Sequence, residues 1–154
     1  KYVTGKSSRV PYYYGLSTRV NYRRFDFGIN GHGSFGNYVL NYEQASQSLM
    51  SLFSSERVAS NISPAALERG FIQQRYFSDM FLESGAFFRL DNITLGYTLP
   101  RLWNDASGLR IALSAQNIKT FTKYSGVDPE IFSGLDNNVY QRPRIYTLSL
   151  NLNF

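Results

Sequence analysis

The sequence predicts an all-β chain whose strands form part of an antiparallel sheet with one apolar and one polar face. The clearest observation is the stretch 146–154, where Tyr146, Leu148, Leu150, Leu152 and Phe154 alternate with small polar residues. Successive side chains of a strand point to opposite faces. A membrane-spanning β-barrel needs this pattern, because lipid lies on one side and an aqueous lumen on the other. The last strand of a soluble β-sandwich alternates in the same way, so this stretch alone favours neither fold.

Composition favours the barrel. Aromatic residues make up 16% of the 154 residues, with 12 Tyr and 12 Phe, and barrels carry such residues in girdles at the membrane interfaces. No apolar run reaches the roughly 18 residues of a transmembrane helix. The chain begins at Lys1 with no charged-then-apolar leader, so we expect it to be mature or, more simply, a piece of a longer protein.

Charge and cysteine content exclude other classes. The net charge is +5, but Lys and Arg are scattered and the only adjacent pair is Arg23-Arg24, so we expect no nucleic-acid binding. The chain has no Cys, which excludes a disulfide framework and thiolate metal sites.

Two strands near the start form a predicted hairpin, over 14–22 and 25–30. Each alternates apolar with polar residues, and a tight connection at Arg23-Arg24 places the apolar residues of both on one face. Arg-Arg is a poor sequence for a type I′ turn, so a slightly longer loop is the alternative. Arg19 and Asp26 lie diagonally on the other face, within reach of an ion pair.

Three further strands are predicted over 87–99, 109–117 and 146–154. In the first of these the apolar residues Phe88 and Leu90 occupy even positions, whereas those from Ile93 onward occupy odd positions. A β-bulge near Asp91-Asn92 accounts for the change, because one extra residue restores the facing. Five strands do not close a membrane barrel, which needs about eight, so in the barrel interpretation most of the protein lies outside this chain.

Long excursions alternate with the short connections, over 31–85 and 118–142. Within the first, 41–53 has helical spacing, and Ser63-Pro64 is typical of a helix N-cap followed by the first helical residue. Barrels show this asymmetry, with short periplasmic turns and long outer loops.

Two motifs indicate chemistry that their context does not support. Residues 31–36 spell G-x-G-x-x-G, but the preceding strand alternates, whereas a Rossmann first strand is continuously apolar. His32 is the only histidine, and a triad with Ser34 and Asp26 is disfavoured because neighbours on an extended segment point apart. Zinc usually takes three or four protein ligands. We therefore predict no catalytic residue, no metal site and no cofactor.

The last excursion holds carboxylates and aromatic rings. The carboxylates lack the spacing and glycine of an EF-hand, and a solvated loop of turn residues is the simpler interpretation. Aromatic faces beside carboxylates suit sugar or peptide cargo, contact with a partner protein, or packing within the loop, and the sequence does not choose among these. The candidate contact residues are Tyr124, Asp128, Glu130, Phe132, Asp136 and Tyr140.

Several motifs follow one another from Phe87 to the end of the chain. They are Phe88–Pro100, Ala115–Asn117, Thr120–Tyr124, Gly126–Glu130, Gly134–Asn137, Tyr140, Pro143-Arg144 and Phe154. This order resembles the carboxy-terminus of the SusC/RagA family, the TonB-dependent outer-membrane transporters of Bacteroidota. Residues 12–36 resemble a family hairpin less specifically, and 37–85 match little. Any one motif is weak evidence, but their shared order makes coincidence a poor explanation.

The resemblance implies that the whole protein is a plugged barrel of about 22 strands in the cell outer membrane. Residues 1–154 would be the carboxy-terminal part of its barrel domain, the last five or so strands, with outer loops at 31–85 and 118–142. The plug and the TonB-contacting segment would lie upstream, and a SusD-like surface lipoprotein would form a lid. Cargo would be an oligosaccharide or, in some members, a peptide, imported with energy transmitted through TonB and without enzymatic chemistry.

In this interpretation the polar strand faces line the lumen and the apolar faces contact outer-membrane lipid. The lumen-facing residues are Arg19, Asp26, Arg110, Ser114, Gln116, Asn151 and Asn153. The alternative is a soluble β-sandwich that serves as a binding or adhesion module. It would require Leu148, Leu150 and Leu152 to face a second sheet.

Phe154 is predicted to be part of the signal that the barrel-assembly machinery reads. An unpaired terminal strand offers backbone donors and acceptors to a template, and an apolar ring at its end would dock beside that edge. Membership of an aromatic girdle at the membrane interface would explain why this residue is aromatic, but not why it is the last residue. Deleting Phe154 should lower the amount of folded transporter in isolated outer membranes, while uptake per folded molecule stays normal. Normal folded levels with impaired uptake would contradict both expectations.

Overall fold

The computed structural model describes residues 5–48, 63–64, 76–100 and 108–153. The chain forms two compact units, which we call the long sheet and the small unit. The long sheet comprises 13–33, 88–121 and 142–154, and the small unit comprises 1–12, 34–87 and 122–141. In the part of the chain that is described, no helix is long and apolar enough to cross a membrane.

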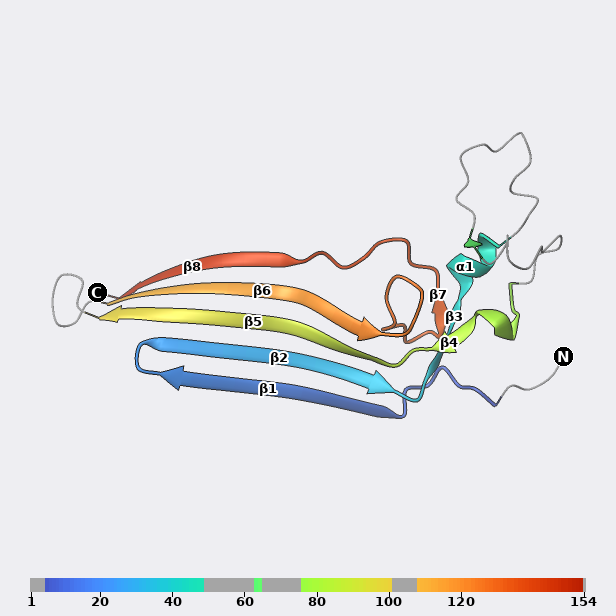
Figure 1. The fold of residues 1–154 in the computed structure, drawn as a ribbon, viewed down its shortest axis with the longest axis horizontal. Helices are drawn as coiled ribbons and strands as arrows, with labels where there is room; N and C mark the ends of the chain where they lie inside the picture. Colours follow the sequence, from blue (N-terminus) through green and yellow to red (C-terminus); the bar gives the residue numbers. More distant parts are fainter. Residues whose placement is uncertain (1–4, 49–62, 65–75, 101–107, 154) are drawn as a thin grey trace, which may run out of the picture. The chain divides into compact units, whose positions relative to one another are not determined.

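The long sheet has five strands in the order β1-β2-β5-β6-β8, each antiparallel to its neighbours (Figure 1). Their bounds are Tyr12–Tyr22 for β1, Phe25–Phe35 for β2, Phe87–Pro100 for β5, Gly108–Thr122 for β6 and Ile145–Asn153 for β8. All five predicted strands are present. Phe154 lies outside the described residues.

Two predicted strand ends were too early. β2 continues to Phe35 instead of ending at Asn30. Gly31 is a strand residue packed closely against β5, and not the start of a loop. A Cβ on Gly31 would lie 2.8 Å from both the carbonyl oxygen of Arg89 and the ring of Phe88. β6 continues past Asn117 to Thr122. Asn117 has φ of 51°, a conformation that Asn tolerates better than most residues.

The hairpin between β1 and β2 turns in two residues, Arg23 and Arg24. The tight connection is therefore the one present, and not the slightly longer loop. Only Arg23 has positive φ, 54°, whereas a type I′ turn needs it at both positions. The carbonyl of Arg24 accepts a hydrogen bond of 2.8 Å from the amide of Thr98, so the turn is also tied to β5.

The pairing of β6 with β8 sorts apolar from polar residues. One face carries the pairs Leu109–Leu152, Ile111–Leu150, Leu113–Leu148 and Ala115–Tyr146, and the other carries Arg110–Asn151, Ala112–Ser149, Ser114–Thr147 and Gln116–Ile145. The apolar face is open in this chain, since Leu148 is 67% exposed and Leu150 is 63% exposed. Because the period of a strand is two, this register is the one that keeps the two faces separate.

Aromatic rings gather near both ends of the strands. At one end Tyr14 of β1 stacks on Phe88 of β5, with centroids 6.0 Å apart, and Phe88 stacks on Phe121 of β6 at 6.2 Å. Tyr14 and Phe88 meet above Gly31, which has no side chain to separate them. Near the β1–β2 turn, Phe25 packs against Tyr97 at 4.7 Å. Two aromatic bands with aliphatic residues between them are typical of a membrane-facing barrel surface.

The small unit contains a second sheet that the sequence did not predict. Its strands β3 (Tyr38–Asn41), β4 (Leu82–Ser84) and β7 (Leu135–Asp136) are ordered β4-β3-β7. β3 is antiparallel to β4 and parallel to β7. Strands of two to four residues are too short to show alternation, so the sequence assigned them to loops.

Two short helices flank this sheet. α1 (Tyr42–Ser46) covers the start of the predicted helix 41–53, and the 3-10 helix η2 (Asp79–Phe81) precedes β4. Asn41 caps α1 by accepting a 3.0 Å hydrogen bond from the amide of Gln44. Pro64 is helical, as predicted, but 49–62 and 65–75 lie outside the described residues. Among the described residues, the buried apolar side chains of the small unit are Val39, Ala45, Phe81, Phe87 and Tyr124.

Candidate functional site

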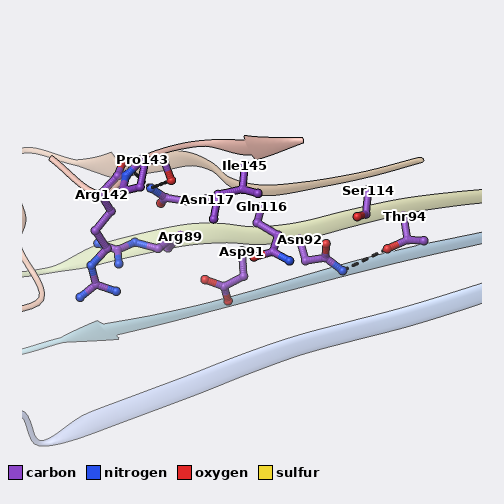
Figure 2. A pocket seen from close by; sticks show the side chains of 10 residues that line it. All are labelled: Arg89, Asp91, Asn92, Thr94, Ser114, Gln116, Asn117, Arg142, Pro143 and Ile145. Atoms are coloured by element: carbon purple, nitrogen blue, oxygen red, sulfur yellow. Dashed lines mark hydrogen bonds between the residues drawn. The ribbon is translucent and has the colours of Figure 1, made fainter. Parts of the chain in front are cut away.

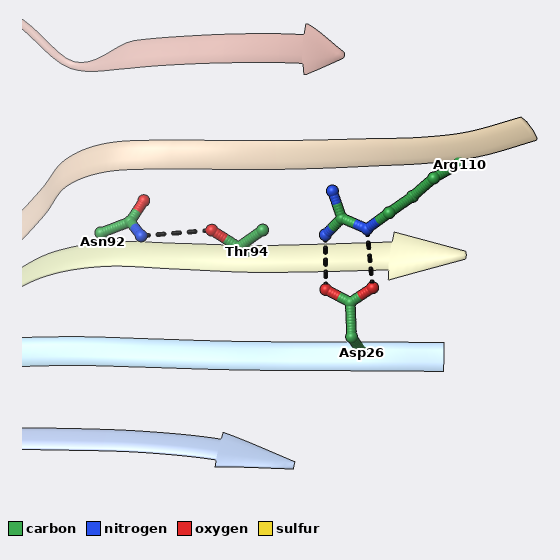
Figure 3. A network of polar contacts seen from close by, with 4 residues as sticks. All are labelled: Asp26, Asn92, Thr94 and Arg110. Carbon is green, nitrogen blue, oxygen red and sulfur yellow. Dashed lines mark hydrogen bonds and ion pairs between the residues drawn. The ribbon is translucent and has the colours of Figure 1, made fainter. Parts of the chain in front are cut away.

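A salt bridge crosses the polar face of the long sheet. The guanidinium of Arg110 on β6 donates to both carboxylate oxygens of Asp26 on β2, with Nε–Oδ1 of 3.0 Å and Nη2–Oδ2 of 2.6 Å (Figure 3). These strands are not neighbours, because β5 runs between them. The pair passes over Gly96 of β5, where a Cβ would collide with Asp26 Oδ1 and lie 2.6 Å from Arg110 Nη2. Any side chain at this point would therefore force Asp26 and Arg110 to move.

The sequence placed Arg19 within reach of an ion pair with Asp26, but the partner of Asp26 is Arg110. Asp26 binds Arg110, and Arg19 contributes only a weaker Coulombic attraction to the carboxylate. The hairpin argument considered β1 and β2 alone. It did not include β6, which lies beyond β5. Arg110 of β6 reaches Asp26 only because Gly96 of β5 has no side chain between them.

A polar pocket of about 530 Å³ lies on the same face, near the ends of the strands that lead into the long excursions (Figure 2). We call it the arginine pocket. It is lined by Arg89, Asp91, Asn92, Thr94, Ser114, Gln116, Asn117, Arg142, Pro143 and Ile145. In a regular strand, Arg89 and Asp91 would face one side of the sheet and Asn92 and Thr94 the other. All four nevertheless line this pocket. A change of phase at Asp91-Asn92 explains this, as the predicted bulge requires.

Hydrogen bonds hold the lining of the arginine pocket. Arg89 is 3% exposed and its Nε donates to Thr120 Oγ1 at 3.1 Å. His32 Nδ1 lies 2.6 Å from Asp91 Oδ2, so the single histidine pairs across the sheet and not with Ser34 or Asp26. Asn92 donates to Thr94 at 3.2 Å.

Asn117 joins β6 to the segment that enters β8. Its Nδ2 donates to the carbonyl oxygens of Arg142 and Pro143, at 2.7 and 3.2 Å. These two bonds offset the positive φ of Asn117 and fix the backbone at Arg142. Sequence reasoning missed Arg89, Asn117 and Arg142, because it treated the first two as ordinary strand residues and placed the third in a loop.

The small unit buries a carboxylate beside a tyrosine. Tyr124 donates its hydroxyl to Asp136 Oδ2 at 2.7 Å, and Asp136 is fully buried. Burial, and then the hydrogen bond and negative charge of Asp136, raise the pKa of Tyr124 well above its usual value near 10. Tyr124 therefore remains a neutral donor at pH values where exposed tyrosines ionise.

A second polar network reinforces the same region. Glu83 on β4 accepts from the amide of Ser125 at 2.8 Å and from its hydroxyl at 2.6 Å. Asn41 on β3 donates to both Glu83 and Ser125. A pocket of about 390 Å³ lies nearby, and its lining includes Asn41, Glu43, Gln44, Gln47, Ser63, Asp136, Asn138 and Gln141.

The predicted contact residues of the last excursion lie in different settings. Tyr124, Asp128 and Asp136 are buried and Glu130 is half-buried, whereas Phe132 is 70% and Tyr140 87% exposed. Of the residues predicted to line a lumen, Ser114 and Gln116 line the arginine pocket, and Asp26 and Arg110 form the salt bridge. Arg110 lies opposite Asn151, Asn153 lies opposite Gly108, and Arg19 is exposed on β1.

Similar proteins were found by sequence and by structure. The chain is 38% identical over 149 residues to the TonB-dependent receptor SusC of Bacteroides thetaiotaomicron, and 28% identical over 159 residues to the TonB-dependent receptor P3 of Formosa agariphila. Each alignment covers 91% of this chain, which spans 15% and 16% of the lengths of these relatives. The resemblance to the SusC/RagA family is confirmed. No protein-family model matches the chain.

The fold of this SusC/RagA-like chain also occurs in solved structures. The RagAB peptide importer in its "closed-closed" state matches all of the chain with a TM-score of 0.75 at 23% identity, and in its "open-open" state with 0.74 at 22%. The match covers 19% of the RagAB chain in both cases. The predicted fold class, part of a larger antiparallel transporter barrel, is thereby confirmed.

Gly96→Ala should weaken the long sheet, because the methyl group forces apart the two bonds between Asp26 and Arg110. The pair is partly exposed, so we expect a loss of about 1–2 kcal/mol. The measurement is the temperature at which the full-length protein in detergent loses its folded mobility in SDS gels. Gly28→Ala is the matched control, since a Cβ on Gly28 meets nothing within 4 Å.

The loss should depend on the pair itself. In an Asp26→Ala background, Gly96→Ala should cost little, because the carboxylate that it displaces is gone. Equal losses in both backgrounds would mean that Gly96 matters for another reason.

Tyr124→Phe should loosen the small unit, because it leaves a buried carboxylate oxygen without its hydroxyl donor. We expect a cost of about 1–3 kcal/mol, seen by hydrogen exchange as faster exchange in 38–41 and 134–136. Tyr140→Phe changes the same group at an exposed position and should leave exchange unaltered. Unchanged protection in Tyr124→Phe would contradict the structural role of the Tyr124–Asp136 bond.

Proposed function

We propose that the whole protein imports an oligomeric nutrient, a glycan or a peptide, through the outer membrane as a TonB-dependent transporter. Residues 1–154 would be the carboxy-terminal part of its barrel domain, and the plug and the TonB-contacting segment would lie upstream. The two curated relatives named as TonB-dependent receptors support this assignment. The RagAB structures, described as those of a peptide importer, support the same kind of barrel.

One observation carries the proposal in this chain: the apolar face formed by β6 and β8. The paired leucines 109–152 and 113–148 and the Ile111–Leu150 pair place aliphatic side chains in one stripe. Four of these side chains are exposed, and those of Leu109 and Ile111 are half-buried. Aromatic bands lie toward both ends of the same sheet. Lipid is the environment that suits this surface, since water would leave a large apolar area exposed.

The opposite face would line the lumen. It carries the Asp26–Arg110 pair, the arginine pocket and the polar residues Ser114 and Asn151. The proposed mechanism is binding followed by gated passage, with no bond made or broken in the cargo. Polar side chains held in the sheet would contact cargo or plug while the apolar face anchors the barrel.

The small unit would form part of the outer vestibule and of the seat for a SusD-like lipoprotein lid. Exposed rings of Phe132 and Tyr140 are the best placed of the predicted contact residues to touch lid or cargo. The buried pair Tyr124 and Asp136 would support the vestibule from within. The lid partnership is the one that the resemblance to the SusC/RagA family implies, and we extend it to this protein.

Spin labels at Leu150 and Asn151 test the two-faced sheet in membranes. The label at Leu150 should be accessible to oxygen, which concentrates in lipid, and the label at Asn151 to a water-soluble quencher. Leu150→Arg should destabilise the folded barrel by about 2–4 kcal/mol if the residue lies near mid-bilayer. Equal accessibility of the two labels would defeat the membrane orientation.

A soluble β-sandwich is separated from the barrel by heating in detergent. An intact barrel keeps its folded mobility in SDS until boiled, whereas a sandwich unfolds without heating. Import itself is tested by uptake of labelled oligosaccharides and peptides by cells with and without the transporter. A barrel that forms normally but takes up neither class would contradict the proposed cargo and leave the membrane assignment intact.

A further inference from the structure

We propose that the arginine pocket binds a carboxylate group of the cargo. The proposal rests on the function proposed above and narrows its substrate class to acidic oligomers. Carboxylates occur both on uronic-acid sugars and at the ends of peptides, so the same chemistry could come from either source.

The charge of the pocket is the first argument. Its lining holds two guanidinium groups, Arg89 and Arg142, and a single carboxylate, Asp91. The Asp91 carboxylate lies 2.6 Å from His32 Nδ1. The pocket therefore carries excess positive charge, and the planar fork of a guanidinium matches the two oxygens of a carboxylate.

The side chain of Arg89 and the backbone of Arg142 are held in place before any ligand arrives. Arg89 is almost fully buried, and its bond to Thr120 joins β5 to β6. The backbone at Arg142 is fixed by Asn117, whose own positive φ persists because its amide donates to two carbonyl oxygens. Residues kept in uncommon backbone conformations cluster at ligand sites, and prior ordering lowers the entropy cost of binding.

The rest of the lining suits the neutral part of an oligomer. The side chains of Asn92 and Gln116 offer amide donors and acceptors, and Ser114 adds a hydroxyl group. Figure 2 shows the two arginines at one end of the pocket and these uncharged polar groups along the sheet from them. A volume of about 530 Å³ is within the usual range of small-ligand sites.

The position of the pocket favours cargo over a segment of the plug. Arg89 lies near the start of β5 and Arg142 just before β8, where the strands connect to the long excursions. The two-residue turn at Arg23-Arg24 lies at the opposite ends of the strands. In a barrel the long connections face the outside, so cargo that enters from outside meets this end first.

The test measures binding to the full-length transporter with its lid protein, using two matched pairs of probes. One pair is tetragalacturonic acid and its methyl ester, and the other is a hexapeptide with a free carboxyl terminus and the same peptide with a terminal amide. We expect the acid form of at least one pair to bind about tenfold more tightly than its neutral form. The pair that shows the preference identifies the source of the carboxylate.

Substitutions then locate the preference. Arg142→Gln should abolish it without weakening binding of the neutral form, and Arg142→Lys should retain part of it. Arg144→Gln is the matched control, because Arg144 is exposed two residues away and is not among the residues that line the pocket. Arg89→Gln should have the same effect as Arg142→Gln, but Arg142 is the safer site since it is exposed and its change does not disturb a buried bond.

Three outcomes would overturn the proposal. They are equal affinity for both members of both pairs, no binding of either acid form, and an Arg142→Gln variant that weakens acid and neutral forms equally. If wild-type cells take up neutral oligomers while any of these holds, transport stands and only the carboxylate pocket fails. If cells take up no oligomer at all, the proposed function itself fails.

Discussion

The structure depends on one constraint, the two-residue period of paired strands. In the β6–β8 pair, leucines and isoleucine meet on one face while Arg110, Ser114 and Gln116 lie on the other. A slip of one residue would exchange the faces and place arginine among the aliphatic side chains. Every polar feature of the long sheet, including the salt bridge and the arginine pocket, therefore requires this register.

Glycines extend this constraint across strands that are not neighbours. Gly31 in β2 lets Tyr14 and Phe88 stack on the apolar face, and Gly96 in β5 lets Asp26 and Arg110 meet on the polar face. In both cases the central strand has no side chain where the flanking side chains meet. Glycine normally weakens a strand, so the gain from the cross-strand pair offsets that cost.

In their described residues, the long excursions are organised largely by buried polar groups. Four of their buried residues are Asn37, Asn41, Asp128 and Asp136. Asn41 donates to Glu83 and Ser125, and Asp136 accepts from Tyr124, so both are bonded to other segments of the small unit. Such networks are directional, which suits a surface that must keep a defined shape with only short strands to support it.

The sequence by itself determined the five long strands, their two faces and the family resemblance, because alternation over six or more residues and an ordered set of motifs are local signals. It also predicted a bulge near Asp91-Asn92 from a change of phase. Only the tertiary structure decided the partner of Asp26, the burial of Tyr124 and the meeting of Arg89 with Arg142 in one pocket. Each of these joins residues at least 12 positions apart along the chain, and the two-residue pattern states which face a side chain occupies but not which distant strand lies beside it.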